Sequence, residues 1–111
     1  MLKQSPNDFK KYRTITLGNG LRVLLIHNEN ATKSAVALAV NAGHFNDPKD
    51  RQGLAHFLEH LLFLGTEKYP DGSEYQKFIS QHGGHHNAWT ATEHTCFFFD
   101  IQESFFSEAL D

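Results

Sequence analysis

The sequence predicts an α+β fold in which helices pack on one face of an antiparallel or mixed β-sheet. Three features favour this class. Residues 18–20, Gly-Asn-Gly, separate two runs of alternating apolar residues, a pattern typical of a β-hairpin. Residues 35–42 form a run of small apolar residues and valines, as in a strand that is buried on both faces. Residues 53–64 are rich in helix formers and are followed by Gly65, a common helix stop.

The expected elements follow one another in the order β-β-β-α-α-β-β-α. They are strands at residues 12–17, 21–26 and 35–42, helices at 53–64 and 73–82, strands at 86–90 and 95–101, and a helix at 103–111. Ser73 with Gln76 three residues later predicts a capping box at the start of the second helix. The apolar pattern of the last helix still runs at Asp111, so we expect residues 1–111 to be the beginning of a longer protein.

The composition fits one domain with a real core and excludes several classes of protein. The chain has 111 residues, 40% of them hydrophobic, and a net charge of −3, which is unlike the basic balance of a nucleic-acid binder. No apolar run approaches the roughly 18 residues of a membrane span. The single cysteine, Cys96, cannot form an internal disulfide. The expected compartment is the cytoplasm, or the periplasm if a leader peptide has been removed.

One segment carries a pattern typical of metal chemistry. His56, Glu59 and His60 form an H-x-x-E-H motif inside the first expected helix. At about 100° per residue, all three side chains share one helix face. Two imidazoles one turn apart suit Zn²⁺, and the carboxylate beside them can take a proton from a zinc-bound water. The motif therefore predicts a site for one zinc ion, with His56 and His60 as ligands and Glu59 as the general base.

The rest of the helix supports this interpretation. Leucines and Phe57 cover its other faces, so we expect the helix to be buried and its polar residues to need partners, which metal and substrate would provide. Phe63 falls on the motif face and is expected to line the pocket that faces the metal. The alternative is a merely solvated strip, but a chance H-x-x-E-H is expected only roughly 0.035 times in a chain of this composition.

A catalytic zinc needs at least three protein ligands, and the motif supplies two. The candidates within the chain are nine residues, and a ligand beyond Asp111 is preferred to any of them: Glu67, Glu74, Glu93, Glu103, Glu108, His82, His85, His86 and Cys96. The histidine cluster also leaves open a metal-storage or sensing module, which would bind several zinc ions per chain.

Four segments of the chain resemble the insulinase/pitrilysin peptidases. These are inverzincins, in which the zinc motif is inverted relative to H-E-x-x-H. The resemblance rests on residues 53–66 around the motif, and on 17–23, 68–70 and 83–90, and it covers nearly the whole chain from about Tyr12. It implies a zinc-dependent endopeptidase or oligopeptidase. A catalytically inactive structural or processing-complex homologue is the alternative, although all three motif residues are present.

The resemblance also implies roles for individual residues. His56 and His60 would be zinc ligands, Glu59 the base and Phe63 a substrate-pocket residue. Residues 87–90 would bind the peptide substrate as an added strand: Asn87, Ala88, Trp89 and Thr90. The third ligand would be a glutamate on a later helix, and the C-terminal remainder of the protein would close a chamber over the site. His85 and His86 stand where many members have small hydroxyl residues, and solvent exposure is favoured over substrate contact for both rings.

Overall fold

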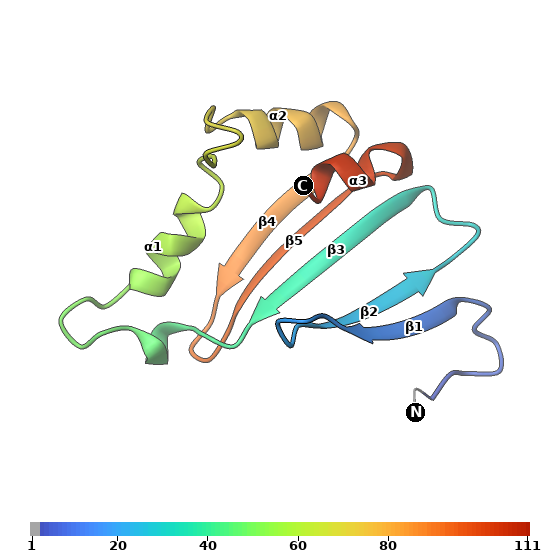
Figure 1. Cartoon of the computed structure of the whole chain (residues 1–111), viewed down its shortest axis with the longest axis horizontal. Helices are drawn as coiled ribbons and strands as arrows, with labels where there is room; N and C mark the ends of the chain where they lie inside the picture. Colours follow the sequence, from blue (N-terminus) through green and yellow to red (C-terminus); the bar gives the residue numbers. More distant parts are fainter. Residues whose placement is uncertain (1–2) are drawn as a thin grey trace. The chain divides into compact units, whose positions relative to one another are not determined.

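The computed structural model describes residues 3–111 and divides into two compact units, one ending at Ala31 and the other running from Thr32 to Asp111 (Figure 1). The first unit is a β-hairpin of β1 (Lys11–Thr16) and β2 (Arg22–His27), which pair antiparallel. In the turn, Gly20 has φ +86° and the side chain of Asn19 accepts the N–H of Leu21 at 3.0 Å. The hairpin predicted from Gly-Asn-Gly is confirmed, because glycine readily adopts this left-handed conformation.

The second unit contains a three-stranded antiparallel sheet. Its strands are β3 (Lys33–Val40), β4 (His85–Thr90) and β5 (Thr95–Gln102), in the order β3-β5-β4. Strand β5 is therefore central, and β3 and β4 are the two edges. The expectation that residues 35–42 would be buried on both faces is wrong, since Leu38 and Val40 are each 43% exposed. A strand at the edge of a small sheet has a neighbouring strand on one side only. The apolar composition of residues 35–42 does not reveal that β3 is such an edge strand.

The core lies where α2 and α3 pack against β5. The helices are α1 (Leu54–Leu61), α2 (Glu74–Gln81) and α3 (Phe106–Ala109), with 3-10 turns η1 (His44–Asn46) and η2 (Glu103–Phe105). Ile79 and Ile101 are almost fully buried, with Phe99 and Ala109 beside them. Phe99 and Ile101 point to the same side of β5, so α2 and α3 cover one face, as predicted for this α+β fold. Figure 1 shows α1 and α2 next to β4, which both helices contact.

Two local expectations need correction. The last helix, expected at 103–111, is a 3-10 turn followed by a single helical turn. The capping box of Ser73 and Gln76 does not form, because the hydroxyl and N–H of Ser73 both donate to the Asp71 carboxylate, at 2.7 and 2.8 Å. Short Asp and Ser side chains favour such local turn bonds over a helix cap.

Helix α1 is not buried as its composition predicts. Phe57, Leu58 and Leu62 are 58%, 53% and 55% exposed, and Glu59 is the one buried residue of the helix. The helix contacts β4 through Glu59 and η1 through His56, and its large apolar side chains stay largely exposed. No helix within residues 3–111 has the length and apolar character needed to cross a bilayer.

Candidate metal centre

The three motif residues come together on α1. The Nε2 atoms of His56 and His60 lie 3.1 Å apart, and the two rings are tilted by 54° with centroids 4.8 Å apart. Together with Glu59 they offer ligand atoms that all lie within 4.8 Å of one another. Among residues 3–111 this is the one group of three or more metal-binding side chains. The spacing of the three residues along the helix therefore brings their side chains close together.

The two imidazoles fit a tetrahedral zinc ion. Two nitrogens that each bind zinc at about 2.0–2.1 Å, with a tetrahedral angle between them, stand roughly 3.3–3.4 Å apart. The observed 3.1 Å between the two Nε2 atoms is close to this separation. Neutral imidazole is also a ligand that zinc prefers. His56 and His60 thus suit zinc in both position and chemistry.

Glu59 is held at the interface between α1 and β4. Glu59 is only 7% exposed, and the hydroxyl of Thr90 donates a hydrogen bond to its Oε2 atom. A buried carboxylate needs such a donor, because an unpartnered charge is costly away from water. The carboxylate therefore has a fixed position beside the two histidines.

A loop residue that the sequence analysis missed caps the N-terminus of α1. The Asp47 carboxylate accepts the N–H groups of Gly53 at 2.7 Å and Ala55 at 2.8 Å. These hydrogen bonds hold the pKa of Asp47 below its usual range, and the bond from Ala55 has the largest effect. His44, whose Nδ1 lies 3.8 Å away, lowers this pKa further. The acid lies six and eight residues before its partners, outside the spacing of a helix cap that a sequence pattern can reveal.

The same loop is fastened to the turn between β4 and β5. The N–H groups of His44 and Phe45 donate to the carbonyls of Ala91 at 3.0 Å and Thr92 at 2.8 Å. Gly43 allows this approach, because a Cβ atom there would stand 2.3 Å from the Ala91 oxygen. The His44 ring also meets His56 edge-on, with centroids 6.4 Å apart. The loop, the turn and α1 are therefore connected to one another.

None of the in-chain candidates for a third ligand joins the motif group. Several have other partners. The His82 ring lies 2.8 Å from the Phe78 carbonyl and packs on Phe105. His85 approaches Asp100, and Cys96 is buried. The third ligand expected beyond Asp111 stays a prediction.

Phe63 belongs to an aromatic cluster on the helix-covered face of the sheet. Its ring lies 5.0 Å from His86, 6.3 Å from Tyr75 and 6.3 Å from Phe97, measured between centroids. Solvent exposure was expected for both His85 and His86. His85 is exposed, but His86 is half-buried and its Nδ1 atom has no hydrogen-bond partner. Burial lowers the pKa of His86 and raises that of Tyr75. The role of Phe63 in a substrate pocket stays a prediction.

The four residues expected to bind substrate lie on the edge strand β4 and alternate between its two faces. Ala88 and Thr90 point to the helix side, and Asn87 and Trp89 point away from it. Trp89 is 48% exposed and its Nε1 donates to His94 at 3.3 Å. The start of β4 borders a hollow of about 340 Å³ that α2 also lines. The structure thus brings Thr90 to Glu59 and leaves the Trp89 side chain on the other face.

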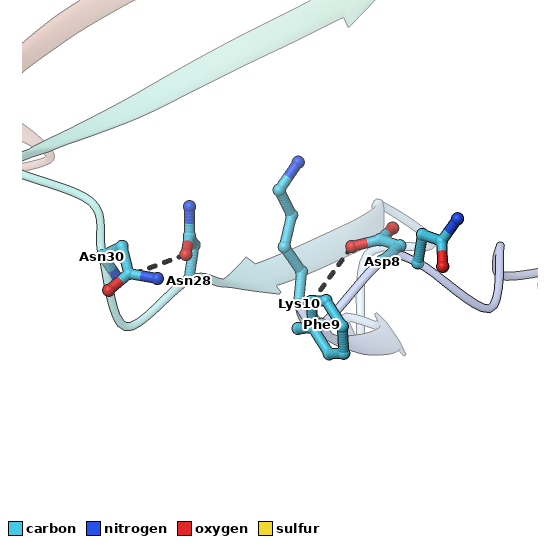
Figure 2. Close-up of a pocket in the computed structure, with 6 residues that line it drawn as sticks. Asp8, Phe9, Lys10, Asn28 and Asn30 are labelled. Carbon is cyan, nitrogen blue, oxygen red and sulfur yellow. Dashed lines mark hydrogen bonds between the residues drawn. The ribbon is translucent and has the colours of Figure 1, made fainter.

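A second hollow lies in the hairpin unit and is not a comparable site. Figure 2 shows its lining, which includes Asp8, Phe9 and Lys10, and its volume is about 350 Å³. The Asp8 carboxylate accepts the N–H of Lys10, and the Asn28 side chain accepts that of Asn30, each at 3.1 Å. These two hydrogen bonds stabilise local turns, and the hollow has no histidine or cysteine in its lining.

Comparison with known proteins places the chain in a family. Residues 22–111 match the family model described as insulinase, peptidase family M16. The insulin-degrading enzyme of Homo sapiens is 46% identical over 110 residues, which cover 99% of this chain and 11% of that protein. A protein of Caenorhabditis elegans whose name describes a zinc protease is 50% identical, over 94% of this chain and 12% of its own length.

A solved structure agrees with the sequence matches. The crystal structure of pitrilysin has a TM-score of 0.94 at 39% identity, over 98% of this chain and 12% of that one. The chain therefore spans only 11–12% of the length of these three relatives. Because the family model matches from Arg22 onward and the pitrilysin fold is reproduced almost throughout, the chain belongs to the insulinase family of peptidases.

Proposed function

We propose that this chain supplies two zinc ligands and the general base of a zinc-dependent peptidase. The observation that carries the proposal is the 3.1 Å separation of the His56 and His60 Nε2 atoms, with the buried Glu59 carboxylate beside them. This arrangement matches the ligand spacing of zinc and leaves positions open for water and substrate. Family membership supports peptide hydrolysis as the reaction.

Within this mechanism Glu59 handles the proton. The two imidazoles would hold a zinc ion, which would supply Lewis-acid chemistry by acidifying water and polarising a peptide carbonyl. Glu59 would accept a proton from the attacking water and return it to the leaving amine. Because Thr90 donates to Oε2, the Oε1 atom is the one left for the proton. We therefore assign this carboxylate the role of base, with the two histidines as the ligands.

The substrate we propose is a peptide that adds to the open edge of β4. Ala91 donates to the His94 carbonyl at 2.8 Å, so the alternation of an antiparallel pair directs the backbone groups of His86, Ala88 and Thr90 away from β5. The Ala88 N–H agrees with this direction, because it donates to the Asn87 side chain at 2.9 Å. Recognition through backbone groups predicts loose sequence specificity.

We further propose that the chain acts as the N-terminal part of the catalytic domain of a longer peptidase and is inactive by itself. The relatives are far longer, and among residues 3–111 no further histidine, cysteine or acidic side chain joins His56, Glu59 and His60. The remainder of such a protein would add the third ligand and close a chamber over the site.

The test compares Glu59→Gln and His60→Ala in the longer peptidase. The amide keeps the size of the carboxylate and can still meet Thr90, but it cannot take a proton. General-base assistance is typically worth about 10²–10⁴-fold, or about 3–5 kcal/mol of barrier, so Glu59→Gln should lose that much turnover and keep its zinc. His60→Ala should lose both. Turnover is measured with a quenched fluorescent peptide and zinc content by atomic absorption.

Matched controls are Glu67→Gln and His27→Ala, which remove the same groups at exposed positions that are not part of the motif. Both should retain zinc and activity. Near-normal turnover of Glu59→Gln would refute the role of base, and loss of zinc from that variant would make Glu59 a ligand. A wild-type protein that holds zinc without hydrolysing any peptide would instead be the inactive homologue.

A further inference from the structure

The contact between Thr90 and Glu59 joins the two halves of the candidate site. Thr90 is the last residue of β4, Glu59 is on α1, and they lie 31 positions apart in the chain. The Thr90 hydroxyl donates to Oε2 of the carboxylate, and Glu59 is 7% exposed. One oxygen of the carboxylate is therefore fixed by the strand on which substrate is proposed to bind.

A glutamate base needs such a constraint. Its side chain has three rotatable bonds, and proton transfer requires one oxygen within about 2.6–3.2 Å of the water. The remaining attachments of α1 act elsewhere, because Asp47 binds the backbone at the N-terminus of the helix. Of the side-chain hydrogen bonds among residues 3–111, that of Thr90 is the one that reaches the Glu59 carboxylate.

Thr90 also touches the open edge of the sheet. Its side chain points to the helix-covered face, and its backbone groups point away from β5, as derived from the bond between Ala91 and His94. A peptide strand that pairs with this end of β4 would order the Thr90 backbone, and with it the hydroxyl that holds Glu59. Substrate binding and base orientation thus depend on the same residue.

We propose that Thr90 is a positioning residue for Glu59, which couples occupation of the β4 edge to the orientation of the general base. The inference rests on the proposed peptidase function and adds a role for a residue that the family resemblance assigns to substrate binding. Thr90 acts through Glu59, so its removal changes the chemical step more than substrate affinity.

The experiment uses Thr90→Val and Thr90→Ser in the longer peptidase. Valine keeps the shape but removes the hydroxyl, and kcat should fall about 10- to 100-fold, the effect of losing a bond to a charged group and misplacing a reacting one. KM should stay within about twofold, and zinc content should not change. Serine restores the donor and should recover kcat to within about threefold of the wild type.

Thr95→Val is the matched control. Thr95 pairs with Thr90 across the two strands and is buried, but its hydroxyl donates to the Ala42 carbonyl at 2.8 Å. This variant should lower the melting temperature and leave kcat unchanged. In a Glu59→Gln background, Thr90→Val should have no further effect on the residual rate, because the two residues act as one unit.

The outcomes separate the inference from the proposed function. An active wild type with kcat unaffected by Thr90→Val would overturn the inference alone, as would a rise in KM without a fall in kcat, loss of zinc, or failure of serine to rescue. A zinc-loaded wild type without turnover would refute the proposed function and overturn the inference with it.

Discussion

Zinc binding by the 111-residue chain itself gives a direct test of the site geometry. The two imidazoles are preset at 3.1 Å between their Nε2 atoms, and no further histidine, cysteine, aspartate or glutamate among residues 3–111 joins them and Glu59. Two protein ligands leave two positions of a tetrahedral zinc to water. We therefore expect one zinc ion per chain, bound much more weakly than at a complete site.

The expected affinity follows from the number of ligands. Structural sites with four protein ligands bind zinc with about 10–16 kcal/mol at pH 7. Two imidazoles should provide roughly half of this, about 5–8 kcal/mol, which corresponds to a Kd between about 1 and 200 μM. With a Kd near 20 μM, about 1 mM zinc would add roughly 2 kcal/mol to the free energy of unfolding.

Calorimetric titration measures the affinity, and thermal unfolding with and without zinc measures the stabilisation. His56→Ala should remove both effects, while His27→Ala, a change on β2, should remove neither. Nanomolar one-to-one binding would refute the reasoning, because it would require further ligands from this chain. Binding that survives His56→Ala would place the metal elsewhere, and several zinc ions per chain would favour the storage or sensing module.

Three further predictions concern the elements around the centre. Ala88→Pro in the longer peptidase removes a backbone N–H from the open edge of β4, and should raise KM for long peptides about three- to tenfold; unchanged kinetic constants would place the substrate elsewhere. Asp47→Ala frees two N–H groups at the start of α1 and should speed their hydrogen exchange about tenfold, with no change in the exchange of β5. Because burial lowers the pKa of His86 below 6.5, the unfolded chain binds a proton first as the pH falls, so stability should be full above pH 6.5 and decrease below it. Denaturant titrations at pH 5 and 7 measure the loss of unfolding free energy between these two pH values. His86→Phe should reduce this loss more than His85→Phe does. An equal loss in the two variants would contradict the role of His86.

The sequence predicts those parts of the molecule that depend on local spacing. The hairpin follows from the glycines of residues 18–20, and the shared face of His56 and His60 follows from the pitch of the helix. The contacts of Asp47 and Thr90 could not be predicted in this way. Each joins segments that only the tertiary fold brings together, across 8 and 31 positions of the chain.

Because α1 is so exposed, the candidate metal centre depends on a few polar contacts. Its polar side faces β4, while Phe57, Leu58 and Leu62 are more than half exposed. Full burial of such side chains typically stabilises a protein by about 1.5–3 kcal/mol each, and here much of that is not realised. The helix is fixed instead by the Asp47 cap and the hydrogen bond of Glu59, together with its contacts to β4. Whatever covers the apolar side of α1 would therefore hold the two histidines more rigidly, so that covering the helix and binding zinc should reinforce each other.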